Sequence, residues 1–196
     1  MSLITVLPEG LYCKQGEFFI DPWRGVDTAL ITHAHSDHAR YGSSRYIATR
    51  ISEGVLKKRL GDNLNLQGVE YGEKIKLGNV WVSFHPAGHV LGSAQVRVEH
   101  QDEVWVVSGD YKRCYDPTCD LFEVVPCDTF ITEATFGLPI YKWQSGEEIC
   151  RQIYDWWQSD RERPSLLFCY AFGKAQRILA ELRQFTDQPV YVHGAV

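Results

Sequence analysis

Three histidines and one aspartate lie within six residues of this chain, from His33 to His38, directly after the apolar run Thr28–Ile31. Unpaired polar groups clustered beside a core strand are costly, so this density predicts that the side chains share bound cations. The end of a strand places such side chains at the rim of a sheet, where loops carry binding residues. We therefore expect His33 and His35 to face one metal ion, while Asp37 and His38 face a second.

Three later segments repeat the pattern of an apolar run followed by a candidate ligand. His89 stands in a glycine-rich segment after such a run, Asp110 follows Val104–Val107, and Glu133 follows Thr129–Ile131. We expect His89 to complete the first metal site and Asp110 to bridge the two ions. Glu133 is expected at the same edge of the sheet.

The residue types predict the class of chemistry. Neutral imidazole and carboxylate ligands suit Zn²⁺, with Mn²⁺ as the alternative ion. Two ions a few Å apart can hold a hydroxide between them and polarise a phosphate oxygen. Because the same ligands can hydrolyse a thioester, a lactam or a phosphodiester, the residues alone leave the substrate open.

The predicted elements change character along the chain. Short β-rich runs and one helix near Ser52–Leu60 fill the first part. Ser145 is a plausible N-cap for a helix, and Gly173 opens another. Strands are predicted beside these helices at Ser165–Tyr170 and Val190–Val192. We therefore expect one domain over residues 1–142 and part of a second, α/β domain over residues 143–196.

Composition excludes few classes. The formal net charge of −5 argues against a protein that binds nucleic acid through charge alone, although metal-binding carboxylates count in this sum. Neither a signal peptide at the start nor an apolar run of membrane-spanning length is found, so we expect a cytoplasmic protein without membrane contact. The six cysteines are irregularly spaced and are expected to be free thiols.

The ordered set His33-x-His35-x-Asp37-His38, His89 and Asp110 resembles the metallo-β-lactamase superfamily. Further motifs are similar to the β-CASP nucleases within it: Ala87–Ala94, Ser108–Lys112, Thr132–Gly137 and Ala171–Leu179. Others look like the bacterial DNA-ligase-associated exonucleases: Gly10–Cys13, Ile20–Trp23, Asp116–Asp120 and Phe136–Tyr141. Together these motifs run through nearly the whole chain.

The resemblance implies the first part of a metallo-β-lactamase αββα sandwich, followed by the beginning of an inserted α/β β-CASP domain. It assigns His33, His35 and His89 to one metal ion, Asp37 and His38 to the other, and Asp110 to both. In that group the acidic residue matching Glu133 orients a catalytic histidine. The expected catalytic residues are thus Asp37, Asp110 and Glu133, with Lys112 and Thr135 as candidate substrate contacts.

The implied function is that of a DNA exonuclease, acting in repair beside an ATP-dependent DNA ligase and a helicase, through attack of metal-bound hydroxide on phosphate. Three alternatives stay open: an RNA-processing β-CASP ribonuclease, a thioester hydrolase of the glyoxalase II type, and a non-catalytic scaffold. The family adds two late histidines, or a histidine and a valine, that this chain lacks. We therefore expect residues 1–196 to be a truncated form that is poorly stable and inactive when isolated.

Overall fold

The structure, a computed structural model, describes residues 2–196. Its internal contacts divide the chain into two units, the first ending at Glu133 and the second running from Ala134 to Val196. The domain boundary expected after residue 142 stays a prediction. Within residues 2–196, no helix combines the length and apolar character that a membrane span requires. All six cysteines are free thiols, as expected.

The first sheet of the first unit has six strands whose spatial order follows the chain: β1 (Thr5–Leu7), β2 (Gly10–Cys13), β3 (Phe18–Ile20), β4 (Thr28–Leu30), β5 (Arg45–Thr49) and β6 (Leu66–Val69). The short 3-10 helix η1 (Arg50–Ser52) and helix α1 (Glu53–Leu60) connect β5 to β6. Strands β3 to β6 run parallel. Because β3 and β4 are parallel neighbours, the residues that follow them emerge at one edge of the sheet.

The second sheet has five strands in the order β11 (Thr129–Ile131), β10 (Glu103–Val107), β9 (Ala94–His100), β8 (Val80–Pro86) and β7 (Ile75–Leu77). Strands β8 and β10 both run antiparallel to β9, and β11 runs parallel to β10. The carboxyl ends of β8, β10 and β11 therefore also meet at one edge.

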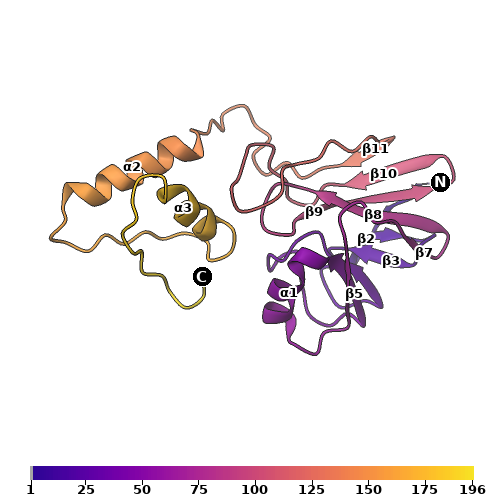
Figure 1. Cartoon of the computed structure of the whole chain (residues 1–196). Helices are drawn as coiled ribbons and strands as arrows, with labels where there is room; N and C mark the ends of the chain where they lie inside the picture. Colours follow the sequence, from indigo (N-terminus) through magenta and orange to yellow (C-terminus); the bar gives the residue numbers. More distant parts are fainter. Residues whose placement is uncertain (1) are drawn as a thin grey trace. The chain divides into compact units, whose positions relative to one another are not determined.

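The two sheets pack face to face around one apolar core (Figure 1). Alternate strand residues from both sheets fill this core and are almost fully buried: Phe18, Ile20, Leu30 and Ile47 from the first sheet, and Val82, Phe84, Val96 and Val98 from the second. A backbone hydrogen bond joins the two edges at which these strand ends lie, since the Ala94 amide donates to the Thr32 carbonyl (2.8 Å). The predicted mixed α/β sandwich is confirmed.

The second unit contains the helices α2 (Gly146–Ser159) and α3 (Lys174–Leu182). Ser145 is the N-cap of α2, as predicted. The Glu148 amide donates to its hydroxyl (3.2 Å), and the Ser145 amide donates to the Glu148 carboxylate (2.9 Å). This reciprocal pair satisfies two amides that the first helical turn leaves without intrahelical partners.

The two strands predicted in the second unit are wrong. Neither Ser165–Tyr170 nor Val190–Val192 forms a strand, and Phe168 and Tyr191 are 90% and 93% exposed. Their β-branched and aromatic residues favour extended backbone, but a strand also needs a hydrogen-bonded neighbour. Residues 134–196 contain no such pairing in the structure.

Candidate metal centre

Four candidate ligands converge where the edges of the two sheets meet. His33 and His35 follow β4, His89 follows β8, and Asp110 follows β10. One ligand atom from each lies within 4.8 Å of the others. His35 Nδ1 lies 3.0 Å from His33 Nε2 and 3.3 Å from His89 Nε2. Asp110 Oδ2 lies 3.9 Å from His33 Nε2 and 3.7 Å from His89 Nε2.

These distances fit a single divalent cation. A tetrahedral ion with ligand bonds of about 2.0–2.1 Å keeps its ligand atoms about 3.3 Å apart. Four of the separations between these donors, at 3.0–3.9 Å, bracket that value, and all of them lie within 4.8 Å. The residues present therefore match a site made of three imidazoles and one carboxylate.

The electrostatics of the site keep two of these imidazoles neutral, which is the form that binds metals. Burial, reinforced by the neighbouring imidazoles of His38, His89 and His35, holds the pKa of His33 well below its ordinary value. Burial also lowers the pKa of His89, although the charges of Asp110 and Glu133 oppose this shift.

A second group of donors lies on the other side of Asp110. Asp110 Oδ1 is 3.4 Å from His38 Nε2, and the same nitrogen is 3.7 Å from Asp37 Oδ2. Asp110 thus presents one oxygen to His33 and His89 and the other to His38. The second cluster of possible ligands within 4.8 Å of one another is Asp21, His33 and His38, so the bridging role of Asp110 and the site formed by Asp37 and His38 stay predictions.

In the absence of metal, a proton balances the negative charge around His38. Burial lowers the pKa of His38, but hydrogen bonds to Asp110 and Asp21, together with their charges, outweigh burial and raise the pKa to about 10. The hydrogen bond from His38 in turn lowers the pKa of Asp110. With Asp37 also beside His38, the group offers an excess of carboxylate charge that a divalent cation would neutralise.

Asp21 belongs to the same cluster of side chains, although no role was predicted for it from the sequence. It follows β3 and accepts hydrogen bonds from His38 Nδ1 (2.7 Å), the Thr32 hydroxyl (2.5 Å) and the Thr32 amide (2.8 Å). The signal was present, because a carboxylate directly after a strand is the pattern that identified Asp110 and Glu133. The backbone of Asp21 has a positive φ of 44°, which also marks it as a specialised position.

Asp21 sets the tautomers of two ligands. The Thr32 hydroxyl gives its one hydrogen to Asp21 and therefore accepts a hydrogen bond from His33 Nδ1 (3.1 Å). The hydrogen of the neutral His33 ring is thus on Nδ1, and Nε2, which faces the other candidate ligands, is unprotonated. Asp21 also takes the Nδ1 hydrogen of His38, so that His38 Nε2 faces Asp37 and Asp110. Carboxylates that orient metal-binding imidazoles in this way raise metal affinity.

Replacement of Asp21 by asparagine is expected to weaken binding of the second ion by about 10- to 100-fold, because an amide cannot accept all three of these hydrogen bonds. Competition with a coloured chelator measures the affinity. Asp27→Asn is the matched control, since Asp27 is exposed near the opposite ends of the strands. Equal affinities for the two variants and the parent protein would refute the orienting role.

The remaining predicted residues lie in different surroundings. The Glu133 amide donates to the Ser108 hydroxyl (3.3 Å), and Glu133 is close enough to act on the pKa of His89. Lys112 Nζ donates to Asp116 (2.8 Å), so its ammonium is already engaged. Thr135 belongs to the second unit. Substrate contacts by Lys112 and Thr135 stay predictions.

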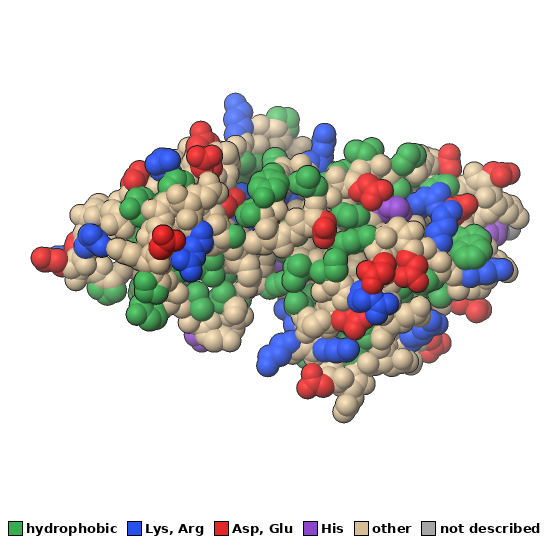
Figure 2. Space-filling model, viewed as in Figure 1, with side chains coloured by type: hydrophobic (Ala, Val, Ile, Leu, Met, Phe, Trp, Pro, Cys, Tyr) green, Lys and Arg blue, Asp and Glu red, His purple; other side chains and the backbone are tan. Residues whose placement is uncertain are grey.

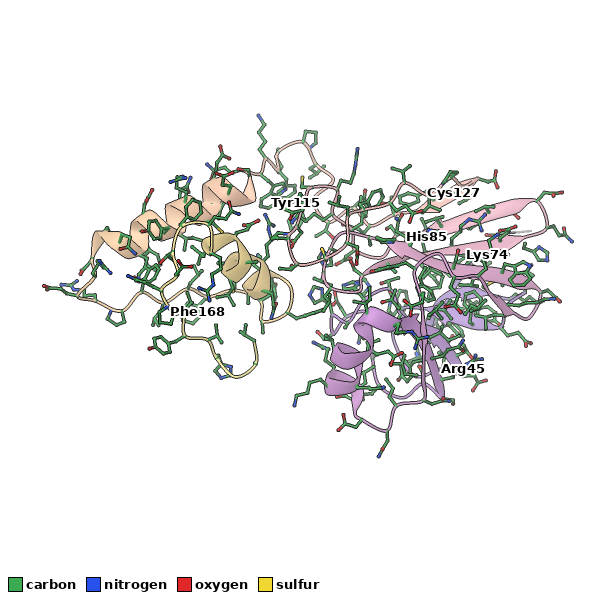
Figure 3. The ribbon with its side chains drawn as sticks, viewed as in Figure 1. Arg45, Lys74, His85, Tyr115, Cys127 and Phe168 are labelled. Atoms are coloured by element: carbon green, nitrogen blue, oxygen red, sulfur yellow. The ribbon has the colours of Figure 1, made fainter. Side chains whose placement is uncertain are left out.

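His85 has hydrogen-bond partners outside the ligand cluster. It lies on β8 (Figure 3). Its two ring nitrogens bind the Ser83 hydroxyl (3.0 Å) and the Glu123 carboxylate (3.1 Å). These contacts attach the segment around Glu123 to β8.

Comparison with known proteins identifies relatives among nucleases and one ligase. The chain is 27% identical to a probable DNA ligase of Opitutus terrae over 94% of its own length and 18% of that protein. It is 24% identical to an RNase J-like protein of Methanocaldococcus jannaschii over 88% of this chain and 48% of that protein. A Thermus thermophilus protein, ribonuclease TTHA0252, is 31% identical over 61% of this chain and 34% of its own length.

The chain thus spans less than half the length of each of these three relatives. No protein-family model matches it. A solved structure of a protein of unknown function from Enterococcus faecalis V583 shares its fold, with a TM-score of 0.60 at 13% identity over 82% of this chain and 45% of that one.

Proposed function

This chain is homologous to the β-CASP nucleases of metallo-β-lactamase fold, and we propose that it carries the two-metal centre of a DNA exonuclease. The main support is the position of Asp110, whose two oxygens face two separate groups of donors. Pairs of divalent ions are well suited to in-line displacement at phosphate. Zn²⁺ is the proposed resident ion, because imidazoles dominate the first group.

Each part of the centre has a proposed task. His33, His35 and His89 would hold one ion, Asp37 and His38 the other, and Asp110 both. When bound, the ions activate a water nucleophile and neutralise charge on the phosphate. Asp21 and Thr32 hold the imidazoles in the required tautomers, and Glu133 supplies a further carboxylate beside His89.

The relative named a probable DNA ligase supports DNA as the substrate. Nearly the whole of this chain aligns with about a fifth of that protein, so a segment of this kind occurs together with a ligase. We accordingly propose that the intact protein acts in DNA repair in the cytoplasm, beside an ATP-dependent ligase and a helicase. The relatives named ribonucleases favour RNA as the second candidate substrate.

Degradation of linear single-stranded DNA by the intact protein, loaded with Zn²⁺ or Mn²⁺, is the expected result. End-labelled linear strands should be shortened from an end, whereas a closed circular strand should resist because it offers none. Removal of the ions by a chelator should abolish the activity and their return should restore it. Metal analysis should find about two ions per chain.

RNA of the same sequence and a thioester serve as comparison substrates. Preferential cleavage of RNA would replace DNA by RNA in the proposal, and cleavage of circular DNA would replace the exonuclease by an endonuclease. Hydrolysis of the thioester without hydrolysis of any nucleic acid would refute the nuclease. Retention of substantially fewer than two ions, with no hydrolysis, would indicate a scaffold.

A further inference from the structure

A pocket lies beside the loop that carries the metal ligands His35 and His38 in the first unit. It has a volume of about 350 Å³. Part of its wall belongs to the same segment as His35 and His38, and the rest comes from the following loop and the end of α1. Its lining residues are Ser36, Ala39, Arg40, Tyr41, Arg59 and Leu60. The pocket therefore shares a loop with two of the candidate metal ligands.

Two guanidinium groups give this pocket its charge. Within residues 2–196, neither Arg40 nor Arg59 forms an ion pair. Arg40 Nε donates to the Asp37 carbonyl (3.3 Å), while Arg59 Nε is buried and has no hydrogen-bond partner. Guanidinium groups match the oxygens of a phosphate geometrically.

Tyr41 adds an aromatic surface at the rim of the pocket. Its side chain is 68% exposed, yet its hydroxyl is fixed by a hydrogen bond to the Arg59 carbonyl. The ring is therefore held in place by one end while much of its surface stays open to solvent. Exposed aromatic rings next to basic side chains are typical of sites that stack single-stranded bases.

The surroundings of the pocket are basic as well. Lys57, Lys58 and Arg59 form the last turn of α1, where Lys57 pairs with Glu53 (3.3 Å). Figure 2 shows Lys and Arg side chains, interspersed with Asp and Glu side chains, on this side of the first unit. The nearby carboxylate of Asp37 faces His38 (3.7 Å), at the metal centre. Polyanionic chains would thus meet a locally favourable potential despite the negative total charge.

We propose that the pocket formed by Arg40, Tyr41 and Arg59 binds the nucleotide that flanks the scissile bond of a single-stranded nucleic acid. The two guanidinium groups bind the flanking phosphate, and the Tyr41 ring stacks on the base. This inference rests on the proposed nuclease function and adds to it a preference for unpaired strands, because a base in a duplex is not free to stack on protein.

Binding of a fluorescent single-stranded oligonucleotide to the metal-free intact protein, followed by anisotropy, tests the proposal without cleavage. Arg59→Ala is expected to weaken binding about tenfold and to reduce the slope of log affinity against log salt by about 0.7, the change expected for one lost phosphate contact. Lys14→Ala is the matched control, because Lys14 is an exposed cation outside the pocket. An equal loss in both variants would refute a specific site.

Substitutions of Tyr41 test whether its aromatic ring stacks on a base. Tyr41→Ala is expected to weaken binding by about 5- to 100-fold, whereas Tyr41→Phe, which keeps the ring, should retain most of the affinity. An oligonucleotide in duplex form should bind less tightly to the parent protein and should be insensitive to Tyr41→Ala. Equal affinity for single and double strands would overturn the proposal.

A small phosphodiester, bis(4-nitrophenyl) phosphate, distinguishes this inference from the nuclease function. If the parent protein hydrolyses neither it nor DNA, the nuclease function fails. If it hydrolyses both, the pocket variants should lose activity on single-stranded DNA, through a raised KM, and keep their activity on the small diester. Unchanged activity of Arg59→Ala and Tyr41→Ala on both substrates would overturn the pocket alone. A stronger effect on RNA than on DNA would support the pocket with RNA as its strand.

Discussion

Replacement of Asp110 by asparagine is expected to remove one of the two bound ions and to lower kcat/KM for a phosphodiester by more than about 100-fold. A change in a residue that only orients a ligand costs up to about that factor, and Asp110 is itself the proposed ligand of both ions. Asparagine keeps the shape of the side chain but removes the charge and one of the two acceptor oxygens. Metal analysis and steady-state kinetics measure the two effects.

Asp102→Asn is the matched control for this experiment. Asp102 lies in the exposed turn between β9 and β10, so the same chemical change there should leave both the metal content and kcat/KM unaltered. Two ions and full activity in the Asp110 variant would contradict the bridging assignment. Loss of activity with both ions retained would instead place the role of Asp110 in the reaction itself.

Replacement of Phe84 by alanine is expected to lower the free energy of unfolding by about 3–5 kcal/mol. Phe84 lies on β8, is fully buried and packs in the core between the two sheets. Its loss leaves a cavity that neighbouring strands cannot close without distorting the sheets. Since folded domains are stable by only about 5–15 kcal/mol, the metal-free protein should lose a large part of its stability. Urea unfolding with a chelator present measures the change.

Trp81→Ala on the same strand is the control. Trp81 lies on the opposite face of the sheet and is 44% exposed, so the loss of an even larger side chain should cost clearly less. Equal costs at the two positions would contradict the location of the core between the sheets. The comparison tests the fold independently of metal binding.

The ligand types and their positions after strands could be predicted from local sequence. The cluster from His33 to His38, with His89 and Asp110, follows apolar runs that do form strands, and strand ends are where loops carry functional side chains. The Ser145 N-cap could be predicted in the same way, because its hydrogen bonds join residues three positions apart. Each of these features depends on neighbours in the chain.

Elements that depend on distant partners escaped the sequence analysis. Strands β2, β5, β6 and β7 were not predicted from the local sequence, yet pairing with neighbouring strands forms them. The opposite error occurred at Ser165–Tyr170, where β-prone residues lack a partner in the structure. Strands thus form where a hydrogen-bonded neighbouring strand is present, even if local β-propensity is weak, and do not form where such a neighbour is absent, even if local β-propensity is strong.

The sequence by itself determined which donors are available and that each stands at the end of a strand, because residue identity and local periodicity are written along the chain. Only the tertiary structure decided that Asp110 faces two groups of donors, that Asp21 orients His33 and His38, and that Arg59 reaches a pocket beside Ser36. These relations join residues from different strands and loops. They arise from strand order, strand direction and the packing of two sheets, and long-range contacts of this kind leave no period in the sequence.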